Sequence, residues 1–299
     1  MSDSILVSSS GTRTLPPKVL GFAPGANGDV APIRAVGGRD KSKLVTASGI
    51  AQDEDGFLFV AAPVIKAVNI YPPGANGDIL PFARLRGPKS ALTNPQGIAI
   101  HDGKLYVANG PFGPGAPGVP SVAVFALPIA GGADDVAPVA VIAGSATGLD
   151  SPFGLALDSL GNIYVSNLND TVTVYAPPSN SSYSEPHNVA PILTISSGLA
   201  GPEGVAIRDD TLYVSNDDNS IAQFSIPDGT PGPVIAGSDT KLDEPLGLSV
   251  DSSGNIFVVN SANQVLKFAT GAGGNAPPVA MISGPATDLN RPQFVFVAP

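Results

Sequence analysis

Glu203 is the strongest candidate for chemistry in this sequence. It is one of four glutamates, and it lies in the phrase Gly201-Pro202-Glu203-Gly204 with apolar residues on both sides. A carboxylate beside carboxamide oxygens suits a hard cation such as calcium or magnesium. It could also act as a base on a metal-activated water, although one carboxylate would then have to serve as both ligand and base. We therefore take Glu203 as the candidate catalytic and metal-binding residue.

Other familiar catalytic arrangements are missing from the sequence. The 299 residues contain no cysteine and two histidines, His101 and His187, which excludes thiolate zinc sites, cysteine nucleophiles and a disulfide scaffold. We expect both histidines to lie on the face opposite Glu203, where no Ser-His-Asp set can form. The run Asp53-Glu54-Asp55-Gly56 lacks the length and terminal glutamate of an EF-hand loop and is interpreted as a turn.

The composition excludes several classes of protein and partner. The 35 glycines and 31 prolines rule out long helices. A net charge of −10 without a cluster of lysine and arginine disfavours a nucleic-acid partner. No apolar run is long enough to span a membrane, and the first residues lack the basic start of a signal peptide. We favour a secreted or periplasmic protein whose leader is absent from this chain, with an intracellular location as the alternative.

Five copies of one repeat identify the elements that must position these residues. Each copy reads Pro-x-Gly followed by an apolar strand, a turn, and a second strand ending near an asparagine; the first copy, at residues 46–51, is the weakest. A third strand ending in an aromatic residue and a fourth strand complete each unit. The marker glycines are spaced 43 to 57 residues apart, at Gly49, Gly97, Gly154, Gly204 and Gly247. Four short strands at such a period are typical of β-propeller blades.

The two ends of the chain supply one more blade. Residues 290–299 form a first strand with nothing after it, and residues 1–44 provide a second, third and fourth strand. Pairing them closes the ring without an open edge. The sequence therefore predicts an all-β, single-domain, six-bladed propeller with four antiparallel strands per blade. Its blades cover residues 45–92, 93–149, 150–199, 200–242, 243–289, and 290–299 together with 1–44.

The phrases Pro-x-Gly-Ile-Ala, Gly-Asn-Ile-Tyr-Val-x-Asn and Val-x-Val-Tyr resemble the NHL-type propeller repeat over the whole chain. Related six-bladed rings include gluconolactonase-like hydrolases, strictosidine-synthase-like proteins, NHL-type amidating lyases and pure binding modules. Resemblance to the gluconolactonase-like group implies a divalent metal held by a glutamate at the start of a first strand and by residues of other blades. Glu203, Asn167 and Asn216 match those types of position, but no second carboxylate does. The amidating lyases use histidines, which this channel lacks.

The same geometry indicates which side chains surround one mouth of the channel. In such rings the loop entering the first strand lies beside the loop leaving the second. One ring of residues is then Ser48, Gln96, Phe153, Glu203, Leu246 and Gln293, and the other is Ser9, Ala62, Asn109, Asn167, Asn216 and Asn260. From these we take Gln96, Phe153, Glu203, Gln293, Asn109 and Asn260 as ligand-binding candidates. The alternative for the asparagines is that they cap turns and bind loop backbone.

Two loops add further candidates at this mouth. The proline- and glycine-rich loop at residues 110–120 contributes Phe112, and the loop at residues 10–14 contributes Arg13.

Two hypotheses about function follow from the whole set of candidate residues. We favour a monomeric, non-catalytic propeller that binds a small molecule, glycan or protein at the channel mouth. The alternative is a hydrolase or lyase of the gluconolactonase-like type, centred on Glu203 and dependent on calcium or magnesium.

Overall fold

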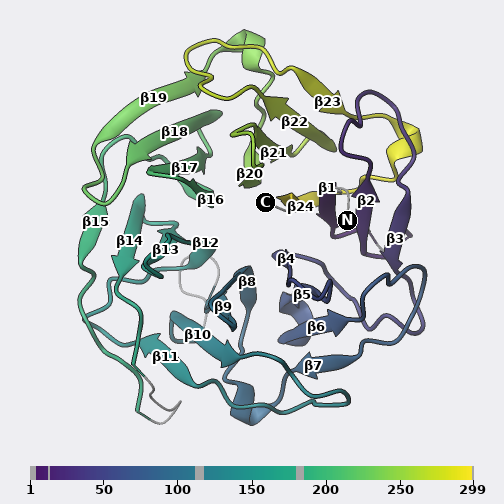
Figure 1. The fold of residues 1–299 in the computed structure, drawn as a ribbon, viewed down its shortest axis with the longest axis vertical. Coiled ribbons are helices and arrows are strands. Elements are labelled where there is room, and N and C mark those ends of the chain that lie inside the picture. The colour runs from purple at the N-terminus through teal and green to yellow at the C-terminus, as the bar shows by residue number, and fades with distance from the viewer. Residues whose placement is uncertain (1–4, 13, 112–117, 180–184, 298–299) are drawn as a thin grey trace.

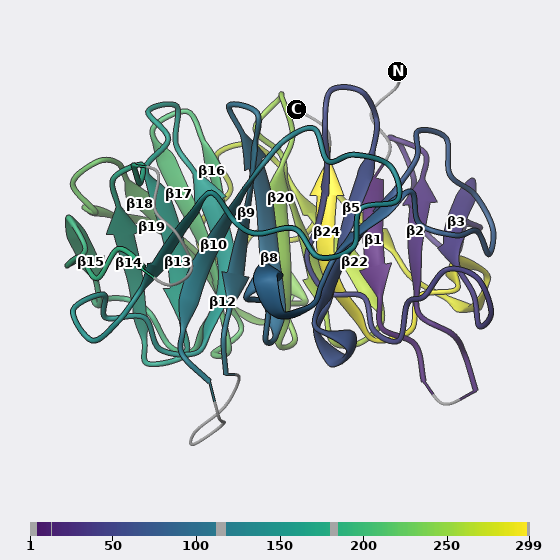
Figure 2. The ribbon, with the colours of Figure 1, turned by 90° about the horizontal axis from the view of Figure 1, so that it is seen from below.

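The computed structural model describes residues 5–12, 14–111, 118–179 and 185–297. In this part of the chain, six four-stranded antiparallel sheets form the blades of a ring around a central channel, as predicted (Figure 1). We number the blades 1 to 6 in the chain order of their first strands, which are the strands at the channel. Figure 2 shows these strands running alongside the channel, with β24 pointing toward one of its two ends.

Each blade is built from short strands that follow one another from the channel outward. Blade 1 contains β4 (Ile50–Gln52), β5 (Leu58–Ala62), β6 (Ala67–Tyr71) and β7 (Ala83–Leu85). Blade 2 contains β8 (Pro95–His101), β9 (Lys104–Asn109), β10 (Ser121–Ala126) and β11 (Ala140–Ala143). Blade 3 contains β12 (Pro152–Leu157), β13 (Ile163–Asn167), β14 (Thr171–Tyr175) and β15 (Leu193–Ile195). Blade 4 contains β16 (Pro202–Arg208), β17 (Thr211–Asn216), β18 (Ser220–Ser225) and β19 (Pro231–Ala236). Blade 5 contains β20 (Pro245–Val250), β21 (Ile256–Asn260), β22 (Gln264–Phe268) and β23 (Ala280–Ile282).

Blade 6 joins the two ends of the chain. It contains β24 (Pro292–Val297), β1 (Ile5–Ser9), β2 (Lys18–Phe22) and β3 (Arg34–Gly37). Strand β24 pairs with β1 in the register Ile5↔Val297, Leu6↔Phe296 and Val7↔Val295. This pairing confirms the predicted closure, in which one blade is shared between the N-terminal and C-terminal segments.

The core lies between neighbouring blades, because each blade buries both of its faces. The aromatic residue at or next to the end of each third strand is fully buried in this core: Phe22, Tyr71, Phe125, Tyr175, Phe224 and Phe268. The tyrosine hydroxyls still find acceptors, since Tyr175 Oη donates to the Thr147 carbonyl at 2.6 Å and Tyr71 Oη donates to the Ser42 carbonyl. Buried hydroxyls without such partners would destabilise the fold.

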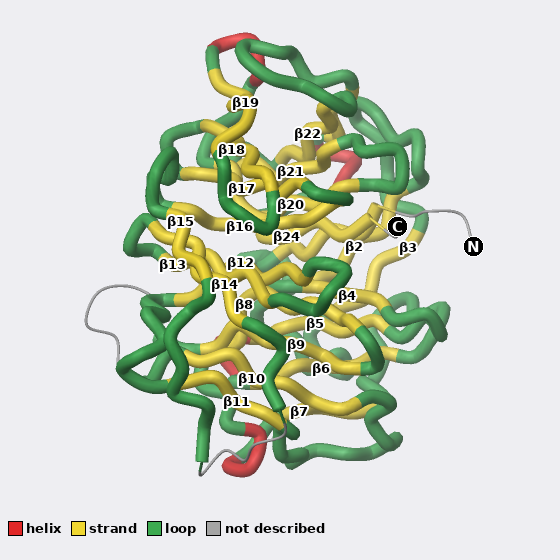
Figure 3. Tube along the Cα trace, turned by 60° about the vertical axis from the view of Figure 1, so that its left-hand side comes forward, coloured by secondary structure: helices red, strands yellow, loops and turns green. Residues whose placement is uncertain are grey.

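Helical structure is confined to loops in the described residues. Four 3-10 turns occur, η1 (Pro63–Ile65), η2 (Pro88–Ser90), η3 (Ser238–Thr240) and η4 (Pro285–Thr287), drawn in red in Figure 3. No described helix has the length and apolar character needed to cross a bilayer. The fourth strands of blades 1, 2, 3, 5 and 6 each begin two residues after a proline, which cannot donate to a β-ladder.

The Pro-x-Gly phrase is the point where neighbouring blades touch. The register between first and second strands shifts across it, for example between Pro152 and Leu155, which marks a β-bulge. A Cβ atom at Gly154 would lie 2.5 Å from the Glu203 carbonyl oxygen of the next blade, and one at Gly97 would lie 2.5 Å from the Phe153 carbonyl oxygen. These glycines let the backbones of adjacent first strands pack directly on each other.

Blade 6 departs from this rule, because Phe294 replaces the glycine of its first strand. The Phe294 ring stacks on Phe153 with centroids 5.1 Å apart and planes 24° apart. Phe294 also belongs to the apolar cluster that fills the boundary between blades 6 and 1. The sixth boundary is thus closed by a side chain instead of by backbone contact.

We expect Gly154→Ala to destabilise the protein by about 1–3 kcal/mol or more, because the added methyl group must push two strands apart. Guanidinium-induced unfolding measures this change in the free energy of unfolding. Gly25→Ala is the matched control, since a Cβ there meets nothing within 4 Å. Equal effects of the two substitutions would show that the first strands do not depend on this contact.

Candidate functional site

The channel has two mouths that differ in size and chemistry. We call the end where the chain enters each first strand the entry mouth, and the end where these strands finish the exit mouth. At the entry mouth there is a pocket of about 230 Å³ whose lining includes Ser48, Gln96, Gln293 and Arg291. Ser48 Oγ donates to Gln96 Oε1 at 2.7 Å, and Gln96 Nε2 donates to Asn94 Oδ1 at 3.3 Å. This pocket is small and polar.

Glu203 lies in the same ring of residues but is sealed from solvent. Its side chain is 7% exposed, and Oε2 is buried without a hydrogen-bond partner among the described residues. Burial, and then the charge of Asp217, raises the pKa of Glu203 to about 8. The carboxyl group is therefore mostly protonated at neutral pH. Such a perturbed carboxyl group marks a candidate functional residue.

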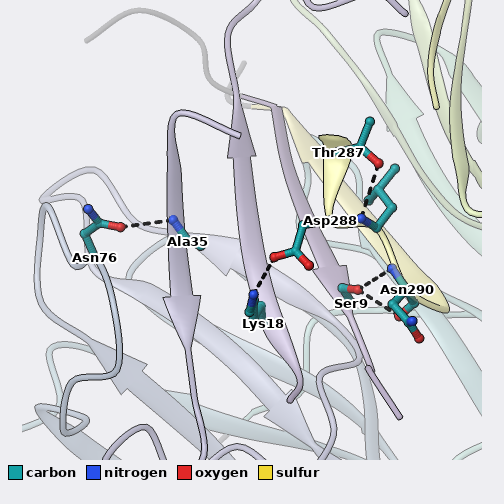
Figure 4. A network of polar contacts seen from close by, with 8 residues as sticks. Ser9, Lys18, Ala35, Asn76, Thr287, Asp288 and Asn290 are labelled. Atoms are coloured by element: carbon teal, nitrogen blue, oxygen red, sulfur yellow. Dashed lines mark hydrogen bonds and ion pairs between the residues drawn. The ribbon is translucent and has the colours of Figure 1, made fainter. Parts of the chain in front are cut away.

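The asparagines at the ends of the second strands bind loop backbone. Asn109 Oδ1 accepts the N–H groups of Thr93 and Asn94 at 2.8 and 3.0 Å. Asn260 Oδ1 accepts the Asp243 N–H at 3.1 Å. In blade 6 a serine takes this role, because Ser9 Oγ accepts the Asn290 N–H at 2.9 Å (Figure 4). Asn109 and Asn260 therefore cap loop backbone, which is the alternative that the sequence left open for the asparagines.

Asn167 and Asn216, the predicted metal ligands beside Glu203, also accept backbone N–H groups of loops. Asn167 Oδ1 accepts the Asp150 N–H at 3.0 Å, and Asn216 Oδ1 accepts the Ala200 N–H at 3.3 Å. Both side chains are buried. Among the described residues, no group of three or more histidine, aspartate and glutamate side chains is arranged to hold a metal ion. A metal site formed by Glu203, Asn167 and Asn216 stays a prediction.

The remaining candidates divide in two groups. Phe153 is buried by its stack on Phe294, and Gln293 Nε2 donates to the Pro292 carbonyl at 3.2 Å beside the entry pocket. Phe112 and Arg13 lie outside the described residues.

A larger cavity opens at the exit mouth. It has a volume of about 800 Å³ and shares no lining residue with the entry pocket. All six first strands line it, and its lining is about as polar as it is apolar. The apolar lining residues form two levels along the channel, with Ile50, Ile98, Leu155, Val205, Leu248 and Val295 in the inner level and Ile100, Leu157, Ile207, Val250 and Val297 in the outer level. Phe294 also lines the cavity, whereas the Phe153 ring stacked on it does not. The aromatic pair therefore lies between the cavity and the entry mouth.

The rim of this cavity is acidic on one side. Asp53, Glu54, Asp55, His101 and Asp102 line it, so His101 lies at the mouth opposite Glu203, as predicted. The predicted turn at Asp53 is also present, because Asp53 Oδ1 accepts the Phe57 N–H at 2.8 Å. Burial raises the pKa of Asp53, and this hydrogen bond opposes the shift. Asp102 lies 3.6 Å from Lys104 Nζ, whereas the described structure shows no ion pair at Asp53, Glu54 or Asp55.

Sequence reasoning placed the site at the entry mouth and missed this cavity. A signal was present in the repeat, because the first strands of blades 2 to 5 continue past their glycine with apolar residues at alternate positions. Ile100, Leu157 and Ile207 in the outer level are only partly buried. Each of them packs against the apolar cluster between two blades and also lines the cavity.

Comparisons with known proteins support the fold. No protein-family model and no curated protein matches this sequence. A protein of unknown function from Bacteroides caccae is similar in structure, with a TM-score of 0.69, 12% identity and 99% of each chain covered. The WD40 β-propeller domain of Doa1 is similar with a TM-score of 0.61 and 13% identity, over 95% of this chain and 80% of that one. A chain of the mitotic checkpoint complex has a TM-score of 0.58 and 14% identity, over 94% of this chain and 75% of that one. These likenesses show a β-propeller fold.

We expect Glu203→Gln to flatten the dependence of stability on pH. The folded-state pKa of about 8 lies above the unfolded value of 4.5, so the folded state retains a proton that the unfolded state has lost. Stability therefore falls as pH rises through this window, by at most about 1.4 kcal/mol per pH unit. Unfolding at pH 5, 7 and 8.5 should show that Glu203→Gln is more stable than the parent at pH 8.5, with a smaller difference at pH 5. Glu54→Gln, at an exposed carboxylate, is the control, and parallel curves for the parent and Glu203→Gln would contradict the assignment.

Proposed function

We propose that this propeller is a binding protein whose ligand inserts an apolar group into the exit mouth. The observation that carries the proposal is the open cavity of about 800 Å³, whose lining includes an aliphatic residue from each of the six first strands. Leaving apolar surface in contact with water costs about 25 cal/mol per Å². A buried ligand would remove that cost, and the cavity volume falls in the range of small-molecule sites, about 300–1,000 Å³.

The rim selects among apolar ligands by charge. Among the described residues that line the cavity there is no lysine or arginine, and Asp53, Glu54 and Asp55 lie together at its edge. The net charge of the chain is −10. An anionic head group such as a fatty-acid carboxylate would be repelled there, whereas a cationic or hydrogen-bond-donating group would be attracted. The ligand that fits is an amphiphile, or an apolar peptide side chain beside a basic residue.

The hydroxyl group in the lining is already engaged with the backbone. Ser249 is the only hydroxyl-bearing residue among the described residues of the lining, and its Oγ accepts the Val297 N–H at 3.2 Å. The repeat phrases support membership of the NHL-type group of propellers, which includes binding modules as well as enzymes. A metal-dependent hydrolase or lyase centred on Glu203 stays a prediction from the sequence.

Binding of the neutral dye Nile red, followed by its fluorescence, tests the cavity. We expect saturable binding that Ile207→Asp weakens at least tenfold, because a charged group replaces apolar wall surface; tenfold corresponds to about 1.4 kcal/mol. Leu160→Asp is the matched control, since Leu160 is 76% exposed and does not line the cavity. It should leave the affinity unchanged.

The rim is tested by competition between amphiphiles of equal chain length, used below their micelle concentrations. Dodecyltrimethylammonium should displace the dye at lower concentration than dodecyl sulfate, and added salt should narrow the difference. Absence of dye binding, or equal losses in Ile207→Asp and Leu160→Asp, would overturn the proposal. Stronger displacement by the anion would overturn the assignment of the rim alone.

A further inference from the structure

Five of the six blade boundaries are closed on the outside by the same contact, which we call the clasp. In a clasp, the loop before the fourth strand of one blade lays one residue along the fourth strand of the preceding blade. Between blades 2 and 3, the His187 N–H donates to the Val141 carbonyl at 2.7 Å, and the Ala143 N–H donates to the His187 carbonyl at 3.1 Å. The next residue, Asn188, accepts the Ala146 N–H at 2.8 Å. The clasp thus consists of a two-bond backbone bridge followed by an asparagine or aspartate cap.

Three of the other clasps follow the same plan, and the clasp on blade 1 is a variant of it. The bridging residues are Gly28 on blade 5, Gly77 on blade 6 and Gly274 on blade 4, and each donates its backbone N–H and accepts one N–H at its carbonyl. On blade 1 two residues share the bridge, because the carbonyls of Ala133 and Asp134 each accept one N–H. The capping residue follows each bridge, as Asp29, Asp78, Asn275 and Asp135. In the clasp on blade 6, Asn76 Oδ1 also accepts the Ala35 N–H at 3.0 Å (Figure 4).

The boundary between blades 3 and 4 has no clasp within the described residues, and both of its halves are shortened. The connection from β18 to β19 is a tight turn, closed by the bond from Ser225 N–H to the Thr230 carbonyl at 2.8 Å. The loop after β15 is shorter too. Seven positions separate Ile195 from Pro202, whereas ten separate the equivalent Ile142 from Pro152. The loop that would provide a clasp and the loop that would receive one are therefore reduced together.

This leaves an open strand edge on the outer surface. Ile195 pairs with Val172 as Ile142 pairs with Val122, so Thr194 and Ser196 correspond to the clasped residues Val141 and Ala143. Both Thr194 and Ser196 are exposed. No hydrogen bond to the Thr194 carbonyl or from the Ser196 N–H occurs in the described part of the chain. A strand edge of this kind is a template for pairing with another chain.

We propose that the edge at Thr194–Ser196 docks an extended segment of a partner protein that supplies the missing clasp. The five internal clasps define the chemistry of that segment. One residue bridges the Thr194 carbonyl and the Ser196 N–H with its own backbone, and an asparagine or aspartate follows it and caps the N–H groups of the loop after β15. The five clasps of this chain are already engaged within their own rings, so the segment comes from another protein.

The probe is a synthetic peptide with the sequence of residues 23–31, Ala-Pro-Gly-Ala-Asn-Gly-Asp-Val-Ala, which forms the clasp on blade 5. Hydrogen–deuterium exchange of the full chain is followed with increasing peptide. We expect saturable slowing of exchange confined to residues 193–199. A control peptide with proline in place of Gly28 lacks the bridging N–H and should have no effect.

A pair of substitutions tests the edge itself. Ser196→Pro removes the bridging N–H and should weaken peptide binding at least fivefold, whereas Ser196→Ala keeps the N–H and should bind like the parent. Circular dichroism verifies that both variants fold. If Ser196→Pro does not fold, the hydrogen–deuterium exchange of the parent chain with the peptide tests the proposal alone. No slowing at millimolar peptide would overturn the proposal, and so would slowing at residues 281–286, where this segment binds within the ring. A dimer by light scattering with residues 193–199 protected before peptide is added would also overturn it, because the edge would then pair with a second copy.

Discussion

The direct contact between the backbones of neighbouring first strands is the constraint on which the rest of the structure depends. At Gly97 and Gly154 the space left for a side chain is taken by the carbonyl oxygen of the next blade. This contact brings the entry ends of the first strands close together, so the residue between proline and glycine projects into a narrow space. Glu203 is buried and the entry pocket is small for this reason. The exit ends carry no such contact in the described residues, and the cavity opens there.

The β-bulges at this contact leave backbone N–H and carbonyl groups without a partner in the strand ladder, and these groups need other hydrogen bonds. In blade 3, Ser166 Oγ accepts the Gly154 N–H at 2.8 Å and donates to the carbonyl of Glu203. In blade 4, Ser215 Oγ accepts the Gly204 N–H at 2.9 Å and donates to the Leu246 carbonyl. The backbone of Glu203 is thus fixed by its neighbour while Oε2 has no hydrogen-bond partner among the described residues. A rigid backbone with an unsatisfied side chain is unfavourable in a purely structural residue.

The fold followed from the sequence because its signal is repeated and local. The Pro-x-Gly phrase fixes a bulge, the asparagine after the second strand caps the neighbouring loop, and the aromatic residue of the third strand fills the core. The site did not follow, because its features depend on contacts between blades. Nothing within one repeat shows that Phe294 stacks on Phe153 and separates the two mouths. Whether Asn167 faces a ligand or a loop N–H likewise depends on where the preceding loop lies. The clasp was partly visible, since the phrase Asn-Gly-Asp recurs at residues 27–29 and 76–78.

The pairing of β24 with β1 has a consequence for the order of synthesis. Strand β1 is made before every other strand of the ring, and its partner β24 is made after all of them. Blades 1 to 5 can each assemble from consecutive residues as the chain grows, but blade 6 cannot. Throughout translation β1 presents an unpaired edge, and the nascent ring is an open arc. The ring can therefore close only after β24 has been made, and until then three strands of blade 6 lack the strand that lies at the channel.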